Sequence, residues 1–371
     1  MKNFLVVFGT RPEAIKLAPL IIESRNYKNI NVSVCVTGQH KEMLTQVLDY
    51  FQIKPDHNLK IMTKNQSLNS ILAKVIIGVD SVISKGNYDL VIVQGDTSSA
   101  FGAGIAAFNN KVRIAHVEAG LRTGDMKSPF PEEANRVLLG CITEFHLAPT
   151  LKNNETLINS GVSPKNIHVV GNTVIDALKF TIQKQKINQF KPKEFEFINK
   201  YEKLILITAH RRENLGKNLE NICESIKILA LENKSIVFVY PVHLNPKVRE
   251  TVFSILNNIS NVKLIDPLDY PEFVYLMNKS YLIISDSGGV QEEAPSLNKP
   301  VLVIRAETER QEGVDAGTLK LIGTNKNQII SETQNLINNH EKYKTISTSI
   351  NPYGDGTASK QILEYILNSI N

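Results

Sequence analysis

Tryptophan is absent from this 371-residue sequence, and only three cysteines, Cys35, Cys141 and Cys223, are present. They are widely spaced, odd in number and never arranged as Cys-x-x-Cys. Disulfide frameworks and thiolate zinc sites both need cysteines at short, regular spacing. We therefore expect neither, and no group of histidines or carboxylates has convincing spacing for any other metal site.

Long hydrophobic runs and clusters of one charge are also missing. No apolar run reaches the roughly 20 residues that span a bilayer, and the N-terminal run "FLVVFG" is too short for a signal sequence. The net charge is only +5, and the densest basic spot, "HRR" at 210–212, is followed directly by a glutamate. Nucleic-acid binding usually needs clustered basic side chains. The sequence predicts a cytoplasmic protein without membrane or nucleic-acid partners, and it favours a small anionic ligand.

Short apolar runs recur along the chain, each followed by a stretch of helical character. One series begins at residues 4, 32, 90, 112 and 145, and a second at 204, 236, 262, 281 and 300. Continuous rather than alternating apolarity is typical of strands buried on both faces of a parallel sheet. Two series of alternating strands and helices predict an α/β protein with two open parallel sheets.

A polar stretch at 181–202 separates the two series. We place the domain boundary just before it, with a first domain at 1–172 and a second at 173–356. The last segment, 357–371, has an amphipathic helical pattern and is expected to pack back on the first domain. Open α/β sheets bind ligands at the carboxyl ends of their strands. The expected site is therefore the cleft between the two domains.

The stretch "SDSGGVQEE" (285–293) has the composition of a phosphate-binding loop. Ser287, Gly288 and Gly289 would open a helix, whose first N–H groups and positive dipole favour an anion. Glu292 and Glu293 would lie about one turn further on, within reach of ribose hydroxyls. The alternative is a helix capped by Ser287 with acids in its first turn; the two roles are compatible.

The stretch "VVFGTRPEAIKLAPL" (6–20) predicts a strand, a tight turn and a helix with one glycine, where dinucleotide-binding folds carry three. The proline after Arg11 suits the first turn of a helix, which places Arg11 at the helix start and Lys16 about one turn on. Arginine gives phosphate a bidentate contact and lysine a point charge. The pattern indicates a nucleotide diphosphate held between the domains, by backbone groups of the second and a guanidinium of the first. Arg305 and Arg310 are further candidates, with surface ion pairing as the alternative for each.

Four carboxylates fall at or near strand ends and helix starts of the first series: Asp96, Glu118, Glu132 and Glu133. Acids crowded beside a diphosphate are costly unless they react or pair with cations, here Arg122 and Arg136. Carboxylates on a sugar ring can move protons on and off carbon or oxygen. Ion pairing and acid/base chemistry therefore both remain open for these residues.

His210 ends the apolar run "LILITAH" and is followed by two arginines. A histidine among cations at a strand end tends to hold or donate a proton near phosphate, which suits assistance to a leaving diphosphate. A core or turn histidine is the alternative. His40, His116, His146 and His243 also follow apolar runs and rank lower, and His146 is expected to be structural.

Taken in order, these loops resemble those of the bacterial non-hydrolysing UDP-N-acetylglucosamine 2-epimerases over essentially the whole chain. The resemblance rests on "FGTRPEAIKLAPL", "VTGQHKEML", "QGDTSSA", "HVEAGLRTGD", "SPFPEEANR", "VVGNTVIDAL", "TAHRREN", "YPVHLNP", "SDSGGVQEEAPSLNKPVLV", "AGTLKLIGT" and "NPYGDG". It implies two Rossmann-like domains of the GT-B type that close on a UDP-sugar, usually in a homodimer.

The resemblance also implies a reaction, inversion at C2 of UDP-GlcNAc to give UDP-ManNAc. In that family the C2 proton is removed and UDP departs, which leaves 2-acetamidoglucal; a proton then returns to the opposite face and UDP adds back. No cofactor is implied, since nothing is oxidised. The product is expected to supply cell-surface polysaccharide.

Residue roles follow from the matched motifs. The resemblance places the acid/base carboxylates on Asp96, Glu118 and Glu132, without assigning which is acid and which is base, and the histidine beside the leaving diphosphate on His210. It places the diphosphate and nucleotide contacts on Arg11, Lys16, Ser287, Gly288, Gly289 and Arg310, the ribose contact on Glu293 and an aromatic near the uracil on Phe273. Some bacterial members bind a second UDP-GlcNAc as an activator, and the matching positions are Gln39, Glu133, Arg211 and His243.

Three other functions compete with this one. A glycosyltransferase of the same architecture would share the "SDSGG" loop but would not need carboxylates facing C2. A hydrolysing 2-epimerase would release free ManNAc and opens with a different first turn. A UDP-sugar-binding regulatory module would have no use for Asp96, Glu118, Glu132 and His210 together.

Overall fold

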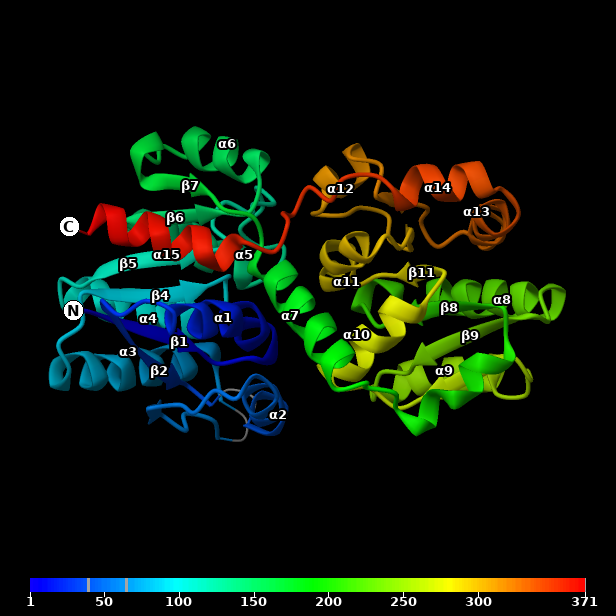
Figure 1. Ribbon diagram of the computed structural model, residues 1–371, viewed down its shortest axis with the longest axis horizontal. Coiled ribbons are helices and arrows are strands. Elements are labelled where there is room, and N and C mark those ends of the chain that lie inside the picture. Colours follow the sequence, from blue (N-terminus) through cyan, green and yellow to red (C-terminus); the bar gives the residue numbers. More distant parts are fainter. Residues whose placement is uncertain (39–40, 64–65, 371) are drawn as a thin grey trace. The chain divides into compact units, whose positions relative to one another are not determined.

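The structure is a computed structural model that describes residues 1–38, 41–63 and 66–370. The chain divides into two compact units, which are described separately (Figure 1). Unit 1 comprises Met1–Ala177 and Tyr353–Asn371, and unit 2 comprises Leu178–Pro352. Both are α/β units built on a parallel sheet, as the two series of apolar runs predict.

Unit 1 contains a seven-stranded parallel sheet in the order β3-β2-β1-β4-β5-β6-β7. Its strands are β1 (Lys2–Phe8), β2 (Ile30–Val36), β3 (His57–Asn58), β4 (Leu90–Gln94), β5 (Arg113–Val117), β6 (Phe145–Ala148) and β7 (Ile167–Val169). Every residue of β4 is buried, because helices cover both faces of the sheet. The strand order reverses between β1 and β4, and the carboxyl ends of strands at such a point are where open α/β sheets bind ligands.

The helices of unit 1 connect these strands. They are α1 (Arg11–Ser24), α2 (Lys41–Phe51), α3 (Leu68–Lys85), α4 (Ser98–Asn109), α5 (Glu132–Ile142) and α6 (Leu151–Asn159), with a short 3₁₀ turn η1 (Pro164–Asn166). The C-terminal helix α15 (Ala358–Ser369), red in Figure 1, packs against α1. Helix α7 (Thr173–Ile187) carries the boundary between the units within its length.

Unit 2 contains a six-stranded parallel sheet in the order β10-β9-β8-β11-β12-β13. Its strands are β8 (Lys203–Thr208), β9 (Ile236–Pro241), β10 (Val262–Ile265), β11 (Leu282–Ser285), β12 (Val301–Val303) and β13 (Leu319–Leu321). The central strands align Leu206 with Val239 on one side and with Ile283 on the other. Here the strand order reverses between β8 and β11, which makes the loops after these strands the counterpart of those after β1 and β4.

The connecting elements of unit 2 are mostly helices on the faces of this sheet. They are α8 (Lys217–Glu232), α9 (Pro246–Leu256), α10 (Tyr270–Lys279), α11 (Gly288–Glu293), α12 (Gln311–Asp315), α13 (Lys326–Asn338) and α14 (His340–Ser347), with the 3₁₀ turns η2 (Lys193–Lys200), η3 (Arg212–Asn214) and η4 (Ala294–Leu297). Buried Ile, Leu and Val side chains from β8, β9 and α8 form its main core.

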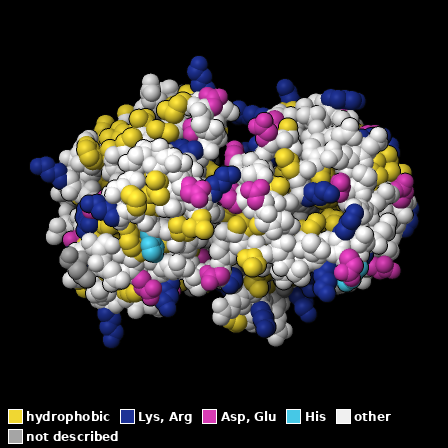
Figure 2. Space-filling model, turned by 90° about the horizontal axis from the view of Figure 1, so that it is seen from above, with side chains coloured by type: hydrophobic (Ala, Val, Ile, Leu, Met, Phe, Trp, Pro, Cys, Tyr) yellow, Lys and Arg dark blue, Asp and Glu magenta, His cyan; other side chains and the backbone are white. Residues whose placement is uncertain are grey.

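The surface carries both signs of charge. On the face drawn in Figure 2, lysine and arginine side chains are intermingled with aspartate and glutamate. Among the described residues, no helix combines the length and apolar character needed to cross a membrane.

Candidate active site

The β1–α1 turn is shaped by Glu13. Its carboxylate accepts hydrogen bonds from the backbone N–H groups of Gly9 and Thr10 at 3.0 and 2.7 Å, as a capping-box glutamate does. Arg11 is thereby fixed at the first helical position. The glycine allows a close approach of elements, since a Cβ on Gly9 would lie 2.3 Å from Ser99 Oγ at the start of α4. This turn therefore uses its glycine for packing and presents a guanidinium at the helix start.

Glu13 also links this turn to the β4–α4 loop. Its carboxylate accepts a 2.6 Å hydrogen bond from the Thr97 hydroxyl and is 1% exposed. Burial raises its pKa, although four hydrogen bonds act in the opposite direction. One buried carboxylate thus holds together the two loops at the point where the strand order of unit 1 reverses.

Glu118 follows β5 with an unusual backbone conformation. Its φ of +65° lies in the left-handed region, which glutamate rarely adopts. One carboxylate oxygen accepts hydrogen bonds from Lys16 Nζ at 2.5 Å and from Gln94 Nε2 at 2.6 Å. The side chains of Lys16 and Glu118 are each 11% exposed. Lys16, predicted as a phosphate contact, therefore pairs with a predicted acid/base residue in this structure.

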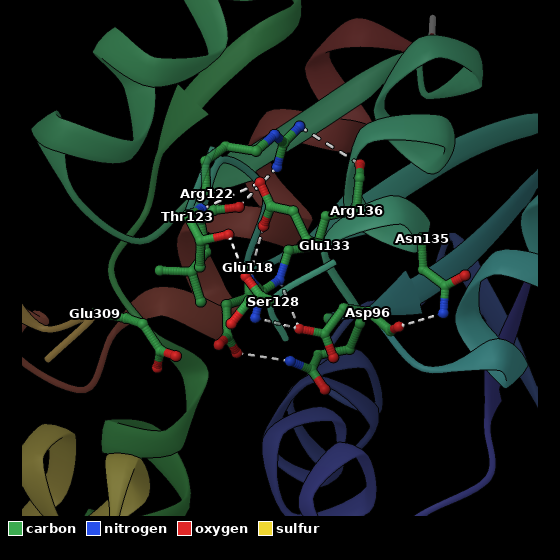
Figure 3. Close-up of polar contacts among 12 residues, drawn as sticks. Asp96, Glu118, Arg122, Thr123, Ser128, Glu133, Asn135, Arg136 and Glu309 are labelled. Atoms are coloured by element: carbon green, nitrogen blue, oxygen red, sulfur yellow. Dashed lines mark hydrogen bonds and ion pairs between the residues drawn. The ribbon is translucent and has the colours of Figure 1, made fainter. Parts of the chain in front are cut away.

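Asp96 and Glu133 share the buried guanidinium of Arg136 (Figure 3). Arg136 donates to Asp96 Oδ2 from Nε at 2.7 Å and to Glu133 Oε2 at 3.0 Å. Burial works against the charge on Arg136, but these two carboxylates outweigh it and raise its pKa. Both acids are therefore ion-paired with Arg136 in this structure. The Asp96 side chain remains 24% exposed, while that of Glu133 is 2% exposed.

Glu133 also orders the segment before α5. Its second carboxylate oxygen accepts the backbone N–H groups of Thr123 and Gly124 at 3.1 and 3.2 Å. Arg122 donates to the carbonyls of Leu121 and Arg136, so its hydrogen bonds go to backbone oxygens.

Glu132 opens α5 and differs from its neighbours. Its side chain is half-buried, and among the described residues its carboxylate has no hydrogen-bond or ion-pair partner. A carboxylate that is not engaged in the protein's own contacts is suited to act on a ligand.

His116 lies on strand β5 and contacts the loop that follows β4. Its Nε2 donates to the Gly95 carbonyl at 2.7 Å, next to Asp96. Burial lowers the pKa of His116 to about 3 and that of His146 to about 4. Both imidazoles are therefore neutral and structural, as expected for His146.

In unit 2, Asp286 links the β8 and β11 loops. It is fully buried, and one carboxylate oxygen accepts the backbone N–H groups of His210 and Arg211 and the amide of Asn214, each at 2.9 Å. Its other oxygen lies 3.3 Å from His210 Nδ1. Burial disfavours the charged form, but His210 and the N–H donors outweigh it and hold the pKa of Asp286 below its usual value.

The predicted phosphate loop places Gly288 against Arg310. A Cβ on Gly288 would lie 3.0 Å from Arg310 Cζ, so the glycine makes room for the guanidinium. Arg310 donates from two nitrogens to one oxygen of Glu292, at 3.0 and 2.7 Å, and from a third to Glu309 at 2.6 Å. Ser287 is the N-cap residue of α11, and Gly289 lies in the first turn. Arg310 is thereby fixed at the start of α11, where the sequence predicts an anion.

The remaining candidates lie around this loop. The predicted ribose contact Glu293 accepts a 2.9 Å hydrogen bond from the Tyr270 hydroxyl and is 7% exposed. Phe273 lies on α10 and is half-buried. Arg305, the other arginine considered for phosphate, pairs with Glu213 at 2.6 Å, but its side chain is only 9% exposed, so this is not the surface ion pair considered as its alternative.

Comparison with known proteins bears on this set of residues. A family model described as UDP-N-acetylglucosamine 2-epimerase matches residues 22–367. The chain belongs to this family. A Campylobacter jejuni UDP-N-acetylglucosamine 2-epimerase is 50% identical over 378 residues, covering 100% of this chain and 99% of the relative.

Solved 2-epimerases share the fold. The Neisseria meningitidis enzyme bound to UDP-GlcNAc is 48% identical, with a TM-score of 0.92, and covers 99% of this chain and 100% of its own. The Methanocaldococcus jannaschii enzyme in complex with UDP-GlcNAc and UDP is 33% identical, with a TM-score of 0.81, and covers 99% and 100%. These matches and the two parallel sheets confirm the predicted α/β class with two Rossmann-like domains and are consistent with the GT-B type.

The four positions expected for an activator in this family have different surroundings. Glu133 is buried in its ion pair with Arg136. The Arg211 backbone is bound by Asp286, and His243 is exposed and stacks on His210 with ring centroids 5.6 Å apart. Gln39 lies outside the described residues.

Sequence reasoning missed the residues that hold these family motifs in place. Glu13 had a signal, because Thr10 three residues earlier forms a capping-box pattern. Asp286, Gln94 and Tyr270 had none, since their partners are distant in the sequence. Among the described residues, no three His, Cys, Asp or Glu side chains gather as a metal site requires.

Proposed function

We propose that this protein is a non-hydrolysing UDP-N-acetylglucosamine 2-epimerase that interconverts UDP-GlcNAc and UDP-ManNAc. The observation that carries the proposal is the group of carboxylates, Asp96, Glu118 and Glu132, at neighbouring strand ends and at a helix start of unit 1. Membership of the 2-epimerase family gives that arrangement its substrate, since relatives of this chain have been solved with UDP-GlcNAc and UDP.

The proposed reaction conserves atoms and electrons without an external oxidant. A carboxylate takes the proton from C2, the C1–C2 double bond forms, and the C1–O bond to the diphosphate breaks with its electrons leaving on UDP. The intermediate is 2-acetamidoglucal. A proton then adds to the opposite face of C2 while the diphosphate oxygen returns to C1. The anti geometry requires acid and base on opposite faces of the sugar, so carboxylates from different loops are needed.

Cations beside the carboxylates support this chemistry. Lys16 pairs with Glu118 and Arg136 with Asp96, so the negative charges of these two carboxylates are offset beside an anionic substrate. Glu132 carries no such pairing among the described residues. General acid–base groups contribute about 10²–10⁴-fold to rate. Kinetic measurements on variants of these three carboxylates identify which is the acid and which is the base.

Unit 2 supplies the proposed nucleotide contacts. Ser287, Gly288, Gly289 and Arg310 would bind the diphosphate, and His210 would assist its departure. In the same proposal Glu293 binds the ribose, Phe273 lies near the uracil and Arg11 binds the diphosphate. Charge-assisted hydrogen bonds of this type are each worth about 1.5–3 kcal/mol.

The proposal extends to assembly and regulation through the family resemblance. We propose a homodimer that supplies UDP-ManNAc for cell-surface polysaccharide, and activation by a second UDP-GlcNAc bound at Gln39, Glu133, Arg211 and His243. Size-exclusion chromatography with light scattering tests the first point. Initial rates measured against UDP-GlcNAc test the second, because an activating substrate gives a sigmoidal curve.

Product analysis tests the proposed function directly. The purified chain is incubated with UDP-GlcNAc without NAD or added metal, and products are separated by anion-exchange chromatography. The proposal predicts an equilibrium mixture of UDP-GlcNAc and UDP-ManNAc. Stoichiometric ManNAc and UDP would show the hydrolysing reaction instead, and binding without any product would contradict epimerase activity on this sugar.

A further inference from the structure

Only one of the two carboxylate oxygens of Asp286 binds the β8 loop. Oδ2 alone accepts three N–H donors, which is enough to fix the β8 loop against β11. Oδ1 is buried, has no hydrogen-bond partner among the described residues, and lies at an ion-pair distance of 3.3 Å from His210 Nδ1. The carboxylate therefore makes a second, separate contact with the imidazole ring.

This contact selects one protonation form of the ring. An ionised carboxylate can only accept a hydrogen bond, so Nδ1 of His210 carries the proton that faces it. A neutral imidazole then has its lone pair on Nε2, and the protonated ring has an Nε2–H donor. The His210 side chain is 37% exposed, and among the described residues Nε2 has no hydrogen-bond partner.

Resting on the function proposed above, we infer that Asp286 is a positioning residue, which holds His210 with Nδ1 protonated so that Nε2 faces the leaving diphosphate. Asp286 directly precedes Ser287 and Gly288 in the chain. The same residue therefore sets the orientation of the ring and the start of the loop proposed to bind the diphosphate. With Nδ1 held protonated, Nε2 is the nitrogen that gains and loses the ring's second proton, so the protonated ring can donate Nε2–H to the departing diphosphate and the neutral ring can take a proton back.

The charged and titratable groups around His210 favour this arrangement. Asp286 supplies the negative charge. His243, from the β9–α9 loop, stacks on the ring; burial, together with the neighbouring His210, lowers the pKa of His243. The Nδ1 of His243 accepts the Asn245 N–H, which requires it to be unprotonated. The Tyr240 hydroxyl donates to the Ala209 carbonyl, next to His210 in the chain.

A buried aspartate elsewhere in the chain provides the matched comparison. Asp176 in unit 1 accepts the backbone N–H groups of Ala358 and Ser359 at 3.2 and 2.7 Å, and no histidine contact is among its hydrogen bonds in the described residues. Asp176→Asn therefore reproduces the loss of a buried charge that binds backbone donors. It leaves the surroundings of His210 untouched.

The first test needs no variant. The full-length protein is labelled with ¹⁵N-histidine, and long-range ¹H–¹⁵N spectra give the protonation state of each ring nitrogen. Comparison with His210→Gln assigns the His210 signals. In the neutral ring, the inference predicts a protonated Nδ1 and an unprotonated Nε2. An unprotonated Nδ1 in the wild-type protein overturns it.

Asp286→Asn tests the causal step. Its amide oxygen can still accept the three N–H donors, but its NH₂ group now faces Nδ1 and donates to it. We expect the His210 signals to switch to the Nε2–H form and kcat to fall by about 10²–10⁴-fold, the range of an acid–base group, with KM little changed. Asp176→Asn should leave the His210 signals in place. Unchanged His210 signals in a folded Asp286→Asn protein overturn the inference.

A double variant separates positioning from a general structural effect. If Asp286 acts through His210, the variant with both Asp286→Asn and His210→Gln has the kcat of His210→Gln alone. Multiplied losses would overturn the inference. Because the ring spectra do not depend on turnover, they still decide the role of Asp286 if the protein proves inactive on UDP-GlcNAc, which would count against the proposed function alone.

Discussion

The left-handed conformation of Glu118 leads to an unusual prediction about stability. In most backbone conformations alanine stabilises a protein relative to glycine by about 0.4–1 kcal/mol, because it restricts the unfolded chain. At Glu118, with φ at +65°, the folded state disfavours any residue with a Cβ by about 1–2 kcal/mol. The two effects oppose each other at this position, and the second is larger.

Glu118→Gly and Glu118→Ala isolate the backbone contribution. Both remove the carboxylate and leave Lys16 and Gln94 without that acceptor, so these losses cancel in the comparison. We expect the glycine variant to be more stable than the alanine variant by about 0.5–1 kcal/mol, the difference between the two effects. Both variants should lose epimerase activity, since the carboxylate is missing from each.

Urea denaturation followed by circular dichroism measures this difference. Ala73→Gly, at an exposed position within helix α3, is the control and should show the ordinary order, with alanine the more stable by about 0.5–1 kcal/mol. If Glu118→Ala proves as stable as Glu118→Gly, the left-handed conformation imposes no strain and the reasoning is wrong. If the glycine variant is the more stable, Glu118 keeps an unfavourable conformation at a position where the carboxylate is needed.

Three further predictions test other parts of the structure. Gly288→Ala should raise the KM for UDP-GlcNAc with the fold retained, because the added Cβ displaces Arg310; steady-state kinetics and a melting curve check this, and an unchanged KM would refute it. Gly9→Ala should lower the free energy of unfolding by about 1–3 kcal/mol, since the added Cβ would overlap Ser99. Denaturant titration measures this, and an unchanged free energy of unfolding would contradict the prediction. The pKa of His116, lowered by burial from 6.5 to about 3, means that the unfolded chain binds a proton that the folded one excludes. Stability should therefore fall as the pH drops below about 6.5, and His116→Gln should weaken that dependence in thermal melts at several pH values.

Most of the strands could be predicted from the sequence, because strands buried in a parallel sheet appear as continuous apolar runs. Strands β3, β7 and β13, of two or three residues each, were not found, since so short a segment leaves no run to detect. Loops that follow parallel strands meet at one edge of a sheet. For this reason Asp96, Glu118 and His210 could be proposed as site residues before their surroundings were known.

The partners of these residues could not be predicted. Lys16 and Glu118 are 102 residues apart, and His210 and Asp286 are 76 apart. Nothing local in the sequence links either pair, so the pairing depends on the tertiary fold. The left-handed φ of Glu118 is equally invisible, because the residue type argues against it.

Hydrogen exchange at C2 tests the central claim most directly. UDP-GlcNAc is incubated with the protein in D₂O, and the sugar protons are followed by NMR. The account predicts that the C2 proton signal disappears as UDP-ManNAc forms. In Asp96→Asn, Glu118→Gln or Glu132→Gln protein that still binds UDP-GlcNAc, the signal should remain and no UDP-ManNAc should form. Formation of UDP-ManNAc that keeps its C2 proton would contradict proton abstraction from carbon by these carboxylates.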